Sequence, residues 1–123
     1  MEILLLLLLL QLKHCYADFK IQTYQQTVRK GIYRDWVGIS HSLDHFWTSL
    51  IALLFFSIFH YIDAFTIVWV AILEALAHYH IDWAKVKFGS KDITKPRFWT
   101  EFGLDQLAHQ MTYLAMTWYL LVR

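Results

Sequence analysis

The chain has 123 residues, of which 58% are hydrophobic and 18% aromatic, while Asp, Glu, Lys and Arg together supply only 17%. This length predicts a single domain over residues 1–123, and the composition is typical of a membrane protein rather than a water-soluble one. The formal net charge of +1 gives no global field for nucleic acid, and the one cysteine, Cys15, excludes an intramolecular disulfide. We therefore expect an all-α integral membrane protein without a nucleic-acid partner.

A leucine run over residues 4–10 opens the first apolar segment, for which we predict a helix over about residues 1–25. A secretory signal peptide would carry positive charge before such a run and small residues at a cleavage site after it. This chain instead has Glu2 before the run and Lys13 soon after it. We therefore interpret the segment as a retained helix.

Three further apolar segments follow, and we predict helices over about residues 36–61, 64–86 and 97–122. Each is long enough to cross a bilayer, which takes about 20 mostly apolar residues. Asp35 and Asp63 stand where N-caps are expected, and Pro96 stands where a first helical turn favours proline. Four antiparallel segments predict an integral membrane up-and-down four-helix bundle.

Basic residues concentrate on one predicted side of the membrane. Nine of the eleven lie in or beside the first and third connections: Lys20, Arg29, Lys30, Arg34, Lys85, Lys87, Lys91, Lys95 and Arg97. By the positive-inside rule these two basic loops are cytoplasmic. Both termini are then expected outside.

Each predicted helix carries two ionisable residues four positions apart. The pairs are His14 and Asp18, His41 and His45, His78 and Asp82, and Asp105 and His109. This spacing puts both side chains on one helix face, and the alternating helix directions bring all four pairs to a similar depth near the cytoplasmic side. Because a charged residue near the bilayer centre costs about 2.5–3.5 kcal/mol, we expect these side chains to face the bundle interior.

Neutral imidazole and carboxylate groups are the usual ligands of zinc and of non-haem iron or manganese. The pairs therefore predict a site for one or two divalent transition-metal ions, with zinc as the first choice and iron or manganese as alternatives. Two other interpretations stay open: a His and Asp hydrogen-bond network that joins the helices, and a proton or ion path. His80 falls on another helix face and is not expected to be a ligand, while Asp44, off the stripe of His41 and His45, is either a hydrogen-bond partner of a ligand or a polar residue near the membrane surface.

Four short motifs stand in order along the chain: HCYADFKIQ, HSLDH, HYHIDWAK and DQLAH. Together they resemble DUF3307, a family of small membrane proteins of unknown function in bacteria, phages and prophages. The resemblance implies four helices, a bacterial inner-membrane location, and roles for His14, Asp18, Gln22, His41, His45, His78, Asp82, Lys85, Asp105, Gln106 and His109. Among these, Gln22, Lys85 and Gln106 are expected to support the metal ligands. The family implies no activity.

The first functional hypothesis is a membrane-embedded metal-dependent hydrolase of a lipid or lipid-linked substrate, with Asp18 or Glu74 as the general base. No Gly-x-Ser-x-Gly motif indicates a serine hydrolase. The alternative is a non-enzymatic phage membrane protein that acts in lysis, superinfection exclusion or ion conduction. Membrane lipids are expected partners in either case. An apolar exterior would also conceal an oligomer interface, so self-association is left open.

Overall fold

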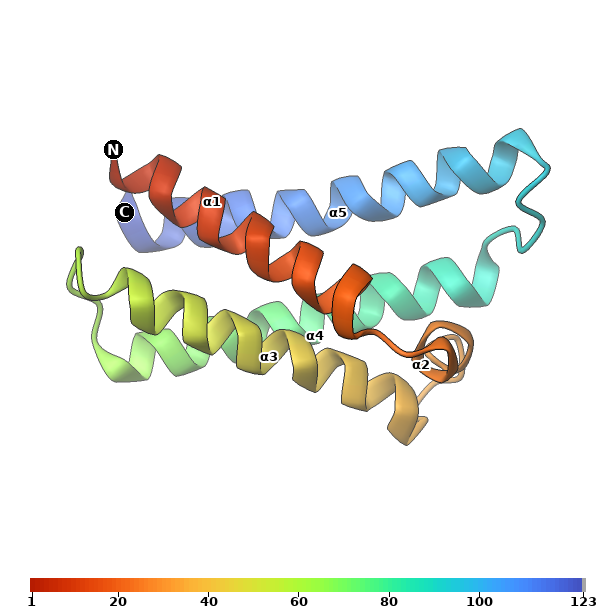
Figure 1. Cartoon of the computed structure of the whole chain (residues 1–123), viewed down its shortest axis with the longest axis horizontal. Helices are drawn as coiled ribbons and strands as arrows, with labels where there is room; N and C mark the ends of the chain where they lie inside the picture. The colour runs from red at the N-terminus through yellow and green to blue at the C-terminus, as the bar shows by residue number, and fades with distance from the viewer. Residues whose placement is uncertain (123) are drawn as a thin grey trace.

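The computed structural model describes residues 1–122, and over that range the chain is helical without any strand. The helices are α1 (Glu2–Cys15), α2 (Tyr24–Arg29), α3 (Trp36–Phe56), α4 (Ala64–Phe88) and α5 (Pro96–Leu121), with a π-helical segment η1 (Tyr16–Ile21) directly after α1. The predicted all-α class is confirmed. The four long helices form the bundle, and the short helix α2 lies at one end of it (Figure 1).

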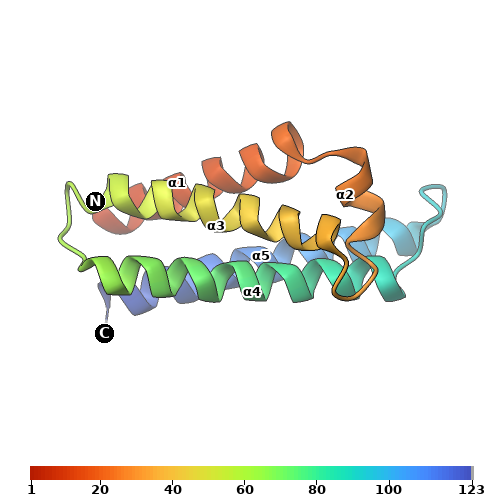
Figure 2. The same ribbon diagram turned by 90° about the horizontal axis from the view of Figure 1, so that it is seen from below.

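The long helices form a closed ring. Helix α1 packs against α3 and α5, and α4 packs against the same two helices. Both termini lie at one end of the bundle beside the link between α3 and α4, while α2 and the link between α4 and α5 lie at the other end (Figures 1 and 2). All nine basic residues of the two predicted cytoplasmic loops therefore belong to the end of the bundle opposite the termini.

The first predicted helix differs from the structure. Instead of one helix over about residues 1–25, the α-helix ends at Cys15, continues as η1 to Ile21, and breaks before α2. The break is stabilised by Thr23, whose hydroxyl accepts a hydrogen bond from the Gln26 backbone N–H while the Gln26 side chain accepts one from Thr23 N–H. This reciprocal capping box starts a new helix in a new direction.

The other helix ends follow ordinary capping chemistry. Asp35 and Asp63 cap α3 and α4 as expected, and hydrogen bonds from the Thr66 hydroxyl and backbone N–H lower the pKa of Asp63 below its usual value. Helix α3 ends at Phe56, five residues earlier than predicted, because the next residues close 3₁₀-type turns such as Ile58 N–H to the Phe55 carbonyl. The link to α4 thus covers residues 57–63.

The bundle interior has two halves. The half near the termini is an apolar core made of Leu6, Leu10, Leu53, Phe56, Ile67, Val70, Tyr113 and Met116. The half near α2 and the basic loops contains the buried ionisable side chains that the sequence pairs predicted. The apolar core therefore closes one end of the polar interior.

The exterior carries many large apolar side chains on all four long helices. Examples are Leu4 and Leu8 on α1, Ile51 and Leu54 on α3, Trp69, Leu73 and Leu76 on α4, and Leu107, Met111 and Leu114 on α5. By length and composition, however, α4 is the one helix among the described residues that meets the requirements of a membrane span. One such helix is weak evidence, so the predicted crossing by all four helices stays a prediction.

Candidate metal centre

Five histidines lie close together in the polar half of the bundle, with His78 of α4 at their centre. Its ring stacks on the rings of His45 and His109, with centroids 3.4 and 4.1 Å away, and lies 5.2 Å from the His41 ring. The His14 ring is 6.1 Å from that of His78. His41, His45, His78 and His109 are each at most 2% exposed. One histidine from α1, two from α3 and one each from α4 and α5 thus meet in one buried volume.

The first group of potential ligands comprises Asp18, His41, His45 and His78, each offering an atom within 4.8 Å of the others. Asp18 Oδ1 lies 2.8 Å from His45 Nε2, 3.1 Å from His41 Nε2 and 3.6 Å from His78 Nε2, and the Nε2 atoms of His41 and His78 are 3.3 Å apart. Around a tetrahedral zinc ion with Zn–N bonds of about 2.0–2.1 Å, neighbouring ligand atoms are about 3.3 Å apart. The observed separations bracket that value.

The second group comprises His78, Asp82 and His109. Asp82 Oδ2 lies 3.2 Å from His78 Nε2, and Asp82 Oδ1 lies 3.4 Å from His109 Nε2. The same Oδ2 atom is 3.3 Å from His41 Nε2, so the two groups adjoin each other. Six of the eight predicted ligands therefore fall into two neighbouring groups that share His78.

The remaining two predicted ligands lie beside these groups. His14 Nδ1 contacts the Tyr113 hydroxyl at 2.8 Å, and His14 Nε2 lies 3.1 Å from Gln106 Oε1 and 3.3 Å from Asp18 Oδ2. Both ring nitrogens of His14 thus have protein partners. Asp105 Oδ1, in contrast, is buried without a hydrogen bond among the described residues, and it lies 3.6 Å from His109 Nε2.

The π-helical segment positions Asp18. A π turn widens the helix locally, and such turns are rare and frequent at functional sites. It places Asp18 so that one carboxylate oxygen reaches His41 and His45 of α3 while the other remains near His14 of α1. Ala17 beside it is completely buried, and a small residue at this position lets the segment pack closely.

Two buried lysines that the sequence did not assign to the site contact it directly. Lys13 Nζ donates to Glu74 Oε1 at 2.7 Å and lies 3.1 Å from His45 Nδ1, while Lys30 Nζ donates to Asp82 Oδ2 at 3.0 Å. A clue to Lys13 was its place beside His14 in an apolar helix, where a charge needs a partner. Lys30 gave no such signal, because its charge was already explained by the basic loop.

Of the three residues predicted to support the ligands, two contact the centre and one does not. With its amide oriented to satisfy both polar atoms, the Gln22 oxygen lies 2.8 Å from His41 Nε2 and accepts from Lys30 Nζ at 3.1 Å. Gln106 contacts His14 and also donates to Asp105 Oδ2 at 3.2 Å. Lys85 does not reach the histidines, because its ammonium lies over the rings of two phenylalanines, Phe98 and Phe102.

Glu74 is buried and fully engaged. Its Oε1 atom accepts from Lys13, and its Oε2 atom accepts from the Ser49 hydroxyl at 2.9 Å. Oε1 also lies 3.6 Å from His45 Nδ1, but that nitrogen is 3.1 Å from Lys13 Nζ, which can only donate, so His45 Nδ1 accepts from Lys13. Metal binding through His45 Nε2 would move the ring proton to Nδ1 and break this contact with Lys13. His80 is exposed, and Asp44 accepts a hydrogen bond from Gln26 and is in neither ligand group.

The interior charges do not balance without a further cation. Four carboxylates, of Asp18, Glu74, Asp82 and Asp105, face two ammonium groups, of Lys13 and Lys30. If the histidines are neutral, the interior carries a net charge of −2. One divalent ion or two protonated histidines would cancel this charge, because an uncompensated charge is costly in a buried interior.

The comparisons agree with the resemblance seen in the four motifs. A family model described as a protein of unknown function, DUF3307, matches residues 4–123. No curated protein and no solved structure matches the chain. Since the family model covers nearly the whole chain, including every residue of the two ligand groups, this chain belongs to the DUF3307 family.

Proposed function

We propose that the polar interior binds divalent transition-metal ions and that the protein is a membrane-embedded, metal-dependent hydrolase of a lipid or lipid-linked substrate. The observation that carries the proposal is the pair of adjoining His and Asp groups, in an interior whose net charge is −2 when the histidines are neutral. The coordinating chemistry suits zinc, with iron and manganese as alternatives. No nucleic-acid role is proposed.

The number of ions decides between a structural and a catalytic centre. One ion bound by Asp18, His41, His45 and His78 would have four protein ligands, as structural zinc sites have. If His78 instead joins Asp82 and His109, each of two ions receives two imidazoles and one carboxylate. Three protein ligands leave a position open, as in catalytic sites. Two ions would also change the interior charge from −2 to +2, which suits an anionic substrate group.

A depression between α4 and α5 is lined in part by Asp105, which lies 3.6 Å from His109 of the second group. It has a volume of about 470 Å³, and Lys85, Arg97 and Asp105 are among its lining residues. Lys85 would hold a phosphate or carboxylate there, since Arg97 is paired with Glu101, which also lines the depression, while Asp105 extends toward His109. This arrangement gives Lys85 a role in substrate binding rather than in supporting the ligands.

The general base is best assigned to Asp105. In the sequence, Asp18 and Glu74 were the candidates, but both oxygens of Glu74 are engaged by Lys13 and Ser49. Asp18 uses both oxygens for histidines. Asp105 lines the depression, and its buried Oδ1 atom has no hydrogen-bond partner among the described side chains. A bound divalent ion lowers the pKa of water to about 7, and a nearby carboxylate can take its proton.

The distribution of polar and apolar side chains supports a membrane location, because it is the reverse of that in a water-soluble protein. The ionisable groups lie inside, while large apolar side chains cover the outside, and only 28% of the most apolar stretch of α4 is buried within the bundle. Exposed apolar patches of this extent need lipid or a protein partner. We propose a bacterial inner-membrane protein with the basic loops in the cytoplasm and both termini outside.

The test of the proposed activity is turnover by the full chain in lipid nanodiscs, measured as release of product from radiolabelled phospholipids and lipid phosphates. Activity should require a divalent metal. Asp105→Asn should abolish turnover while retaining the metal, and Asp44→Asn, which removes a carboxylate outside the centre, should leave both unchanged. Metal loading without turnover on any such substrate would refute the hydrolase and leave a non-enzymatic membrane protein as the better account.

A further inference from the structure

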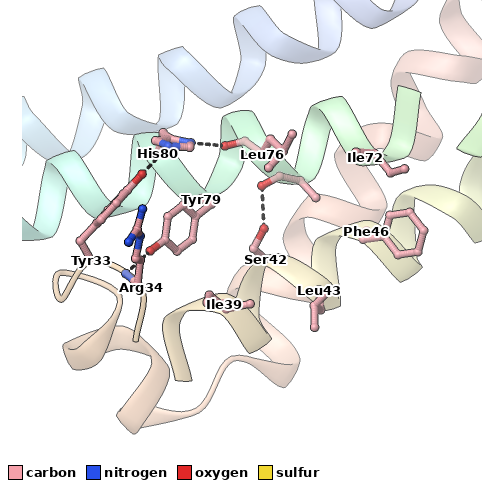
Figure 3. Close-up of a pocket in the computed structure, with 11 residues that line it drawn as sticks. Tyr33, Arg34, Ile39, Ser42, Leu43, Phe46, Ile72, Leu76, Tyr79 and His80 are labelled. Carbon is pink, nitrogen blue, oxygen red and sulfur yellow. Dashed lines mark hydrogen bonds between the residues drawn. The ribbon is translucent and has the colours of Figure 1, made fainter. Parts of the chain in front are cut away.

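A second hollow lies on the opposite face of α4, between α3 and α4, with a volume of about 510 Å³. This size falls within the range of about 300–1,000 Å³ typical of small-molecule sites. Its residues are not those of the metal centre. Figure 3 shows Ile39, Leu43 and Phe46 of α3 facing Ile72 and Leu76 of α4 along it, with Tyr33, Arg34, Tyr79 and His80 gathered at one end.

The long part of this groove is apolar. Ile39, Leu43 and Phe46 recur every three or four residues, so they form one stripe on α3 roughly 10 Å long at a rise of about 1.5 Å per residue. The hydroxyl of Ser42, which could have made the floor polar, donates to the Ala75 carbonyl at 2.6 Å. The groove therefore offers a dry surface suited to a hydrocarbon chain.

The end near the basic loops carries one uncompensated cation. Arg34 forms no ion pair among the residues that the structure describes, whereas its neighbours Arg29 and Lys30 are paired with Asp35 and Asp82. His80 is engaged on both ring nitrogens, by the Leu76 carbonyl and the Tyr33 hydroxyl. Arg34 is thus the group at this end with an unused positive charge.

The backbone of Arg34 has a strained conformation. Its φ of 63° lies in the left-handed region, which side chains other than glycine rarely adopt. The Arg34 N–H donates to the Tyr79 hydroxyl at 2.7 Å, which ties the loop to α4. In Figure 3 the guanidinium lies between Tyr33 and Tyr79, and it is 5.8 Å from the Tyr33 ring. Strained residues held this firmly are frequent at ligand sites.

Because the groove is apolar along its length and has a cation at one end, we infer that it binds one anionic phospholipid, with its phosphate on Arg34 and an acyl chain between α3 and α4. The inference rests on the proposed membrane location but not on metal binding or catalysis. Charge complementarity favours this occupant, because one cation lies at the headgroup end and the apolar groove extends from it along the surface of the bundle. A zwitterionic lipid would bring its own cation beside Arg34, so the site should prefer a net negative headgroup.

Native mass spectrometry of the detergent-purified chain tests this, with equimolar phosphatidylglycerol and phosphatidylcholine of identical acyl chains. The parent should retain phosphatidylglycerol preferentially. Arg34→Gln should weaken that preference about tenfold, while Lys95→Gln, an equal charge change outside the groove, should not. Leu76→Trp should fill the groove and lower retention of both lipids. Leu107→Trp is its matched control, because the two leucines are 53% and 54% exposed.

Three results would overturn the inference: equal retention of both lipids by the parent, unchanged preference in Arg34→Gln, or a bound protein or second copy in place of lipid. Metal content and far-ultraviolet circular dichroism of each variant separate this result from other failures. A groove variant that keeps its metal and helix content but loses lipid preference supports the lipid site alone. A parent that selects phosphatidylglycerol yet contains no metal refutes the metal centre and leaves the lipid site standing.

Discussion

The buried ion pair between Lys13 and Glu74 gives a quantitative test of the polar interior. Its side chains are 5% and 1% exposed, and the two charged atoms are 2.7 Å apart. Lys13→Met leaves the Glu74 carboxylate buried with only hydroxyl partners, so we expect a loss of about 3–5 kcal/mol in the free energy of unfolding. Adding Glu74→Gln removes the stranded charge and should recover at least about 2 kcal/mol of that loss.

The assay is equilibrium unfolding of the four members of this double-mutant cycle in mixed micelles, followed by helical circular dichroism. The control cycle is Arg97→Met with Glu101→Gln, because that pair joins the same kinds of charge at the surface, where Arg97 is 70% exposed. Its coupling should stay below about 1 kcal/mol. Couplings under about 0.5 kcal/mol in both cycles would refute the reasoning that this ion pair lies in a dry interior.

Two further predictions concern packing and topology. The Cβ atom of Gly38→Ala would lie 2.9 Å from the Lys30 backbone, so this change should displace Lys30 and lower the free energy of unfolding by about 1–3 kcal/mol. Gly103→Ala has open space around it and should instead stabilise the folded protein by about 0.5–1 kcal/mol. Thermal unfolding of both variants in detergent compares the two. In a Cys15→Ser background, a membrane-impermeant maleimide should label Ser57→Cys but not Ser90→Cys in intact cells, and the reverse pattern would contradict the proposed orientation.

Much of the bundle was predictable from local patterns. Apolar length, the caps at Asp35 and Asp63, and Pro96 define three of the four long helices to within a few residues, apart from the earlier end of α3. The repeated spacing of four residues predicted that the histidines and aspartates meet, because spacing determines which helix face they share. Such signals are local, and each helix carries its own.

The parts that were missed depend on contacts between distant segments. The π turn at residues 16–21 and the break after it arise from how Asp18 reaches α3 and how Thr23 caps α2, and neither was evident in the apolar pattern. Lys13 and Lys30 were not assigned to the site, although Glu74 and Asp82, 61 and 52 positions away, are their partners. Without these pairs, the interior charge of −2 for neutral histidines could not be derived from the sequence.

The central claim, that the His and Asp groups bind metal, is tested most directly by elemental mass spectrometry of the gently purified chain. We predict one or two divalent transition-metal ions per chain, lost in His78→Ala and retained in His80→Ala, which removes an exposed histidine two positions away. Two ions would indicate the pair of open sites, and one ion would indicate the four-ligand site. Folded protein without stoichiometric metal would contradict the claim and require two protonated histidines to balance the interior instead.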